Sequence, residues 1–289
     1  MHKSKGARMN KLLLVDGSNL LFQMFFGMPA RIVNSRGKAI HGTMGFVGAL
    51  LKIIRITNPT HIAVLFDGEH ENGRAALNPE YKANRIDYGK VAEEENPFTQ
   101  LADIYSALDY LKIKHAETIC CETDDWIAGY AMTCKNAIHI VISSFDSDYF
   151  QLISDNVSVL RYRGVKSVVC TPEYVFERFG VMPAQYADFK ALVGDAADNI
   201  RGADKIGPKT AACLLKMFST LENIIANAGQ IERQNVRQSV ILNTQRLRTN
   251  YKLIKLTDGA ELPFTLDELE ISEINSTTNE TLKAIGLLP

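Results

Sequence analysis

The sequence predicts an α/β protein with a mostly parallel central sheet flanked by helices, followed by a smaller helical part. As far as about residue 180, short apolar runs alternate with segments whose apolar residues recur at helical spacing. From Pro183 onward the pattern is almost wholly helical. Strands separated by helices pair in parallel, because a right-handed crossover returns each strand in the same direction. The 289 residues suffice for one α/β domain with a helical annex.

The lengths of these runs define the individual elements. Runs such as KLLLV and HIAVLF are apolar after their first residue, as in strands that are buried on both faces of a sheet. The predicted strands cover residues 11–15, 61–66 and 139–143. The predicted helices cover residues 42–56, 97–111, 123–134, 183–193, 209–218 and 231–255. We therefore expect an α/β core at 1–182 and a helical subdomain at 183–289.

The segment 81–96 differs from its surroundings. It is polar, charged and poor in aliphatic residues, and it is too long for an ordinary crossover turn. We therefore expect an exposed functional loop or arch here.

Composition excludes several classes of protein. With 46% hydrophobic and 22% charged residues, the chain is neither disordered nor fibrous. Its five cysteines form no C-x-x-C pair, which argues against a zinc finger or a disulfide scaffold and favours reduced thiols in the cytosol. No apolar run approaches the roughly 20 residues that span a membrane. The 32 basic and 33 acidic residues give a net charge of −1, which by itself indicates no nucleic-acid partner.

Acidic residues follow the predicted strands. Asp16 and Asp67 end the first two strands, and Asp146 and Asp148 follow the third. Because ligands bind outside the carboxyl ends of parallel strands, these acids converge on one crevice. Any one of them alone would be interpreted as a turn residue or a helix cap. Further acids lie at the start of the helix before the third strand and at the end of a later helix. The full set is Asp16, Asp67, Glu122, Asp124, Asp125, Asp146, Asp148, Asp195 and Asp198.

Nine acids gathered in a cleft would repel one another unless cations neutralised them. The set contains only hard oxygen ligands, with neither histidine nor cysteine, and this favours Mg²⁺ or Mn²⁺ over zinc. The sequence therefore predicts a centre for divalent cations. The four histidines His41, His61, His115 and His139 share no spacing and are expected to be structural, as is Trp126.

Six motifs occur in one order along residues 11–221: LLLVDGSNLLF, LFDG, NPEYKANR, CETDDWIAGYA, ISSFDSDYFQLI and VGDAADNIRGADKIGPKTAACLL. In these motifs the chain resembles the 5′-nuclease family, which includes the 5′→3′ exonuclease domain of bacterial DNA polymerase I, phage 5′-exonucleases and flap endonucleases. All nine acids match metal-cluster positions of that family. Phe145 and Ser147 depart from its usual T-G-D-[KR]-D, and Thr123 departs from its E-A-D-D, but no acid is lost. No polymerase sequence follows, which suggests the stand-alone bacterial form.

The resemblance implies a PIN-like core, a helical arch and a C-terminal helix-three-turn-helix around 186–218. It implies two Mg²⁺ ions, with Mn²⁺ as the alternative. Asp16, Asp67, Glu122 and Asp124 would lie toward one ion, and Asp146, Asp148, Asp195 and Asp198 toward the other, with Asp125 in support. Lys82 and Arg85 would be the catalytic basic residues that contact the scissile phosphate. Tyr81 is a candidate for stacking on a displaced base, although a packing role is nearly as well supported.

The stretch Gly202–Thr210 resembles the family's duplex-binding turn. Glycines before a helix leave backbone N–H groups available to a phosphate, although a Gly-Pro pair there is usually only an N-terminal turn. The resemblance allows a K⁺ ion in this turn. The loop 34–38 is a further candidate for facing DNA. The candidate DNA-binding residues are Tyr81, Gly202, Lys205, Gly207, Lys209 and Thr210.

The charge outside the acidic set agrees with a nucleic-acid partner. Without the nine acids, 24 acidic residues face 32 basic ones, a net charge of +8. We therefore expect a monomeric, cytosolic, metal-dependent 5′-nuclease. Its DNA substrates would carry flaps, nicks or free 5′ ends, including RNA-primed ones, in replication and repair. The alternatives are a non-catalytic junction-binding relative and a Mg²⁺-dependent phosphatase of the D-x-D type, for which the D-x-D follows the wrong strand.

Overall fold

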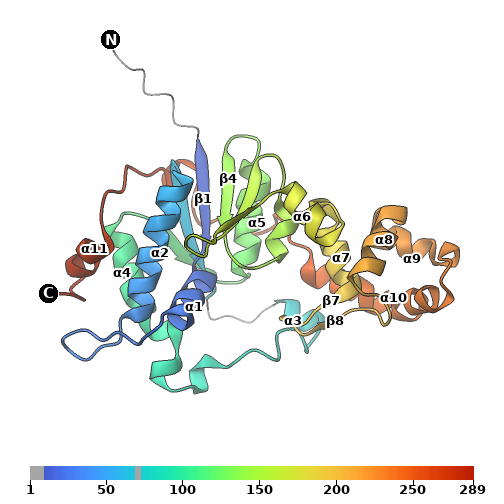
Figure 1. Ribbon diagram of the computed structural model, residues 1–289, viewed down its shortest axis with the longest axis horizontal. Coiled ribbons are helices and arrows are strands. Elements are labelled where there is room, and N and C mark those ends of the chain that lie inside the picture. Colours follow the sequence, from blue (N-terminus) through green and yellow to red (C-terminus); the bar gives the residue numbers. More distant parts are fainter. Residues whose placement is uncertain (1–9, 69–72) are drawn as a thin grey trace, which may run out of the picture.

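The computed structural model describes residues 10–68 and 73–289. Figure 1 shows a larger lobe built around a sheet and a smaller helical lobe beside it. The six strands lie in the order β3-β2-β1-β4-β5-β6, and all neighbours pair in parallel except β5 and β6. The predicted mostly parallel sheet is thus confirmed. The strands are β1 Lys11–Asp16, β2 His61–Phe66, β3 Lys114–Glu117, β4 His139–Ser143, β5 Val157–Arg161 and β6 Val168–Cys170.

Helices cover both faces of the sheet because successive residues of its central strands point to opposite sides. Leu13 and Val15 of β1 pack with one set of helices, α1 Gly17–Gly27, α2 His41–Thr57 and α4 Leu101–Tyr110. Leu12 and Leu14 pack on the other side, beneath α5 Thr123–Cys134. All four of these side chains are fully buried.

The helical lobe continues the second of these cores. Buried residues of α7, α8 and α10 belong to the same apolar cluster as Leu12 and Leu14, so the two lobes share a hydrophobic interior. The helices after the sheet are α6 Pro172–Phe179, α7 Tyr186–Val193, α8 Pro208–Phe218, α9 Leu221–Ala226 and α10 Gln234–Ile254. A short hairpin of β7 Gly194–Asp195 and β8 Ile200–Arg201 follows α7. The last helix, α11 Thr278–Ala284, returns to α2 on the larger lobe.

The strands at 61–66 and 139–143 and the helix at 123–134 have the predicted bounds. The periodicity did not reveal α1, β3, β5 or β6. The strand β3 reads KHAE and lies at the sheet edge without a fully buried residue, so it lacks the apolar signature of the central strands. The division at 182/183 stays a prediction.

The segment expected to form an arch is exposed along most of its length. After α3 Gly73–Leu77 it contains one-turn 3₁₀ helices at Tyr88–Lys90 and Glu93–Glu95. The Tyr88 ring of this segment and the Phe98 ring just after it meet the Phe22 ring of α1 at centroid distances of 5.1 and 5.4 Å. These edge-to-face contacts hold the far end of the segment against the larger lobe.

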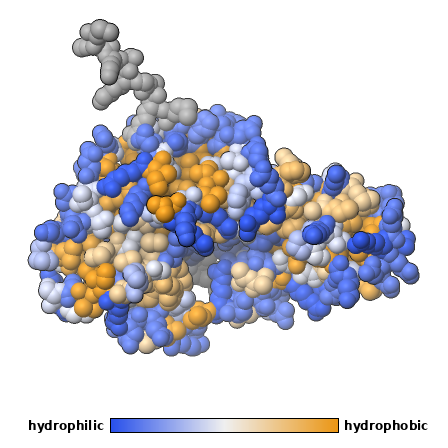
Figure 2. Space-filling model, in the orientation of Figure 1, coloured by the Kyte–Doolittle hydropathy of each residue, from blue (hydrophilic) through white to orange (hydrophobic). Residues whose placement is uncertain are grey.

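The visible surface carries hydrophilic and apolar areas on both lobes, and the most strongly apolar ones lie on the larger lobe, as Figure 2 shows. Across 10–68 and 73–289, no helix is both long enough and apolar enough to cross a membrane.

Candidate metal and nucleic-acid site

The first group of acids forms where β1 and β2 end. Asp16 is the last residue of β1 and also caps α1, since its carboxylate accepts from the backbone N–H of Asn19 at 3.0 Å. The hydroxyl of Ser144, just beyond β4, donates to the other oxygen of Asp16 at 2.9 Å. Asp67 follows β2 and accepts from the backbone N–H of Thr123 at 2.9 Å. The sheet and two helix starts therefore fix these carboxylates.

Gly68 shows why a glycine follows Asp67. A β-carbon at this position would lie 2.1 Å from the carbonyl oxygen of Thr118, closer than any real contact. The chain after β2 can therefore pass the loop before α5 only if residue 68 has no side chain. This close approach brings Asp67 next to the α5 N-terminus.

The start of α5 supplies three more acids. Glu122 is its N-cap, and Glu122 and Asp125 form a reciprocal capping box, with the Glu122 N–H donating to Asp125 at 3.2 Å. Asp124 accepts from the buried hydroxyl of Tyr149 at 2.6 Å, and the same hydroxyl lies 3.3 Å from Asp16. Capping thus explains the local geometry of the ETDD motif, and Tyr149 links Asp124 to the end of β1.

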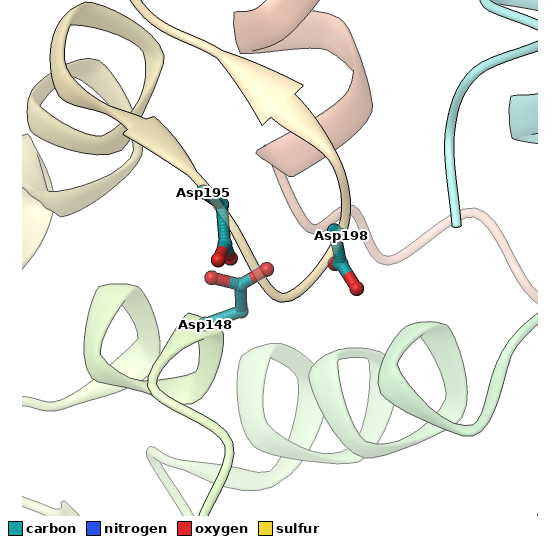
Figure 3. Close-up of side chains that lie close together, drawn as sticks. All are labelled: Asp148, Asp195 and Asp198. Atoms are coloured by element: carbon teal, nitrogen blue, oxygen red, sulfur yellow. The ribbon is translucent and has the colours of Figure 1, made fainter. Parts of the chain in front are cut away.

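The second group joins the two lobes. Asp148 follows β4, whereas Asp195 and Asp198 come from the β7–β8 hairpin. Figure 3 shows these three carboxyl groups gathered between the hairpin and the segment after β4. One oxygen of each lies within 4.8 Å of the others. Asp146 is close to both groups, since its carboxylate accepts from the Asp148 N–H at 2.8 Å and its charge raises the pKa of Asp16 and Asp124.

Three of the carboxyl groups, those of Asp16, Asp124 and Asp148, have a raised pKa and so resist ionisation. Burial, followed by the charge of Asp67, raises the pKa of Asp16 from 3.8 to about 7. Burial and then the charges of Asp146 and Asp16 also raise the pKa of Asp124 well above its usual value. Burial raises the pKa of Asp148 to about 7, although Lys190 opposes the shift. The acids thus repel one another as the sequence predicted, and cations in the cleft would relieve that repulsion.

Four basic side chains contact this set. Lys82 and Arg74 both donate to Glu122, and Arg74 also reaches Asp125. Arg85 donates to Asp198 at 2.8 Å, and Lys190 donates to both Asp148 and Asp195. Lys82 and Arg85 therefore lie beside the acids, and their contact with a scissile phosphate stays a prediction.

Sequence reasoning missed Arg74 and Lys190. A lysine in the middle of the apolar helix YADFKALV is a usable signal, because lysine is almost never buried without a partner. Burial disfavours the charged form of Lys190, but Asp148 and Asp195 outweigh that effect and raise its pKa. The sequence around Arg74 gives no comparable signal.

The segment that carries Lys82 is joined to the hairpin that carries Asp198. The Lys82 N–H donates to the carbonyl of Asp198 at 3.0 Å. The Asn84 side chain donates to the carbonyl of Ala196 at 3.2 Å, and the Asn199 side chain donates to the carbonyl of Glu80 at 2.8 Å. These bonds fix the base of the predicted arch to the helical lobe and orient its basic residues over the acids.

Of the two roles considered for Tyr81, burial favours packing over stacking on a base. Its side chain is 6% exposed and belongs to the main apolar cluster, while its hydroxyl donates to Glu122 at 3.2 Å. Trp126 is likewise buried and donates to the carbonyl of Glu261 at 2.8 Å, which confirms its packing role. No histidine joins a potential metal-binding group within the described part of the chain.

The Gly202–Thr210 stretch forms an exposed turn anchored by two buried residues. Ala203 and Ile206 are buried, whereas Lys205 and Lys209 are exposed to solvent. A β-carbon on Gly202 would lie 2.3–2.5 Å from backbone atoms of Leu192 and Val193, so this glycine is required by packing. Gly207 and Pro208 begin α8, with Pro208 in the first helical turn. In the loop 34–38, Arg36 and Lys38 are exposed but bond within the chain, to Gly286 and Asp103.

Family comparisons cover nearly all of the chain. Residues 11–180 match the family described as 5′-3′ exonuclease, N-terminal resolvase-like domain, and residues 181–277 match 5′-3′ exonuclease, C-terminal SAM fold. The thermostable DNA polymerase I of Thermus thermophilus is 34% identical over 258 residues, which cover 89% of this chain and 30% of that protein. The chain thus spans about a third of the polymerase relatives that it matches.

A shorter relative and a solved structure match over most of their own length. The 5′-3′ exonuclease of Aquifex aeolicus is 31% identical over 265 residues, 91% of this chain and 87% of that protein. The flap endonuclease of bacteriophage T5, in a complex with DNA and metal ions, has a TM-score of 0.70 and 25% identity, covering 85% of this chain and 89% of that one. These matches leave no place for the D-x-D phosphatase alternative, and the chain belongs to the 5′-3′ exonuclease family.

Proposed function

We propose that this chain is a metal-dependent 5′-nuclease that hydrolyses DNA phosphodiesters near junctions of single and double strands. The observation that carries the proposal is the convergence of acids from both lobes beneath the basic residues of one exposed segment. The names of the Aquifex exonuclease and the phage flap endonuclease support the same activity.

The residues fit divalent cations. Every donor is a carboxylate oxygen, which suits Mg²⁺ or Mn²⁺, and burial already penalises the charge that such ions would neutralise. Asp16, Asp67, Glu122 and Asp124 would hold one ion, and Asp148, Asp195 and Asp198 a second. Asp146 would also lie toward the second ion, because it accepts from the Asp148 N–H, and Asp125 supports Glu122 through the capping box. Bound ions would supply an activated water and charge neutralisation for an in-line displacement.

Lys82 and Arg85 would stabilise the charge that develops on the phosphate. Both reach the acids from the base of the arch, and Arg85 keeps 53% of its side chain exposed while it bonds to Asp198. Their backbone is fixed to the hairpin, so that little reorganisation is needed when a phosphate enters. A free 5′ strand would pass the arch segment 81–96.

The turn at Gly202–Thr210 would hold the duplex through its phosphates. Lys205 and Lys209 project into solvent beside the start of α8, and the charge outside the acidic set is +8. Backbone and lysine contacts to phosphate position a duplex without reading its bases. We further propose that this turn binds a K⁺ ion and that the substrates include RNA-primed DNA. The protein would act as a monomer in the bacterial cytosol.

Cleavage of a 5′-labelled flap substrate tests the proposal. We expect incision near the junction with Mg²⁺, no incision with EDTA, and roughly 10²–10³-fold slower incision by Lys82→Ala. Lys135→Ala is the matched control, because Lys135 is exposed and lies between α5 and β4, at the opposite end of the sheet. Binding without incision under every metal tested would contradict the proposal and make the chain a junction-binding protein.

A further inference from the structure

The side chain of Lys190 occupies an unusual place in the helical lobe. It extends from α7, a helix in which all residues from Tyr186 to Leu192 are buried, and only 7% of the side chain is exposed. An ammonium group in such a place is very costly unless it is paired. Its two hydrogen-bond partners are the carboxylates of Asp148 and Asp195, which also belong to the second acid group.

The two partners come from different lobes. Asp148 follows β4 of the sheet, whereas Asp195 follows α7 in the β7–β8 hairpin. Without a positive charge between them, these two carboxylates and Asp198 would repel one another across the lobe boundary. Lys190 is fixed on α7 five residues before Asp195, so its ammonium is present before any ion arrives.

We propose that Lys190 is a built-in counter-charge of the second acid group, which holds the two lobes together there and weakens the binding of a divalent cation. The inference rests on the proposed function, since it assumes that Asp148, Asp195 and Asp198 bind a cation. An oxygen that accepts from an ammonium is a poorer ligand for a cation, and the positive charge of Lys190 repels the cation itself. Lys190 is thus a positioning residue that sets the metal concentration at which the second ion binds.

Calcium binding without DNA tests this role, because it needs no turnover. We expect Lys190→Met to bind Ca²⁺ at least tenfold more tightly than the wild type at its weaker site in calorimetric titration, equivalent to about 1.4 kcal/mol. Lys190→Arg keeps the charge and should bind Ca²⁺ as the wild type does, and exposed Lys135→Met should change nothing. A Ca²⁺ dissociation constant for Lys190→Met within twofold of the wild type would overturn the inference.

A charge-balance cycle in EDTA tests the same role without any metal. Lys190→Met should be less stable to urea than the wild type, and Asp195→Asn added to it should restore much of the loss, since it removes the uncompensated charge. Simple loss of packing would give additive effects, and that outcome would also overturn the inference. If the single variant Lys190→Met does not fold, the double variant with Asp195→Asn still tests the inference. A pure packing role predicts that the double variant does not fold either, whereas the counter-charge role predicts that it folds. Absence of Ca²⁺ binding by every variant would instead refute the proposed function.

Discussion

Replacing Asp16 with Asn should abolish nuclease activity and yet stabilise the metal-free protein at pH 8. Asp16 is 6% exposed, and burial together with Asp67 raises its pKa from 3.8 to about 7. A shift of about 3 pKa units corresponds to about 4 kcal/mol of unfavourable free energy when the group must ionise. Asn carries no charge and can still cap α1 by accepting from the N–H of Asn19.

The substitution also has a cost. Ser144 donates to the Asp16 oxygen that an amide nitrogen would replace, and losing this bond costs about 1–2 kcal/mol. The expected net stabilisation at pH 8 is therefore about 2 kcal/mol.

The gain should depend on pH in a defined direction. Between pH 4 and 7 the native Asp16 retains a proton that the unfolded chain has released, so wild-type stability falls as pH rises through this interval. Near pH 4 the native Asp16 is protonated and the unfolded one is only about half ionised, so the ionisation penalty shrinks to about 0.5 kcal/mol and the advantage of Asn should vanish.

Urea unfolding in EDTA at pH 8 and at pH 4.5 measures both effects. The control is Asp155→Asn, which makes the same chemical change at an exposed turn just before β5. If Asp16→Asn were no more stable than the wild type at pH 8, the repulsion inferred for the acidic set would be wrong.

Three further predictions follow from single contacts. Gly194→Ala should cost about 2–4 kcal/mol in urea unfolding, since φ is +85° and the new β-carbon would lie 2.4 Å from the Gly202 nitrogen, whereas Gly229→Ala meets no atom within 4 Å. Tyr81→Phe should lose about 1 kcal/mol of stability and Tyr81→Ala about 3–5, because the ring is buried; equal losses would contradict the packing role. Lys209→Ala should reduce the slope of log affinity for duplex DNA against log salt concentration by about 1, and an unchanged slope would place Lys209 away from the phosphates.

The acids of the site were the most predictable part of the molecule. Strands at 61–66 and 139–143 could be read from unbroken apolar runs, and once the strands are parallel, the residues that follow them must share one edge. Helix capping depends on residues that are neighbours in the sequence, so the ETDD motif predicted the start of α5. The order of motifs was sufficient to identify the family.

The sequence by itself thus determined the three adjacent strands β2, β1 and β4, the acids that follow them and the family to which the chain belongs. Only the tertiary structure decided which charges meet. The contacts of Lys190 with Asp148 and of Arg74 with Glu122 join residues 42 and 48 positions apart. Periodicity reports which face of an element is buried but not the neighbour that buries it. For the same reason the sequence left Tyr81 open between stacking on a base and packing, and the structure places its ring in the core.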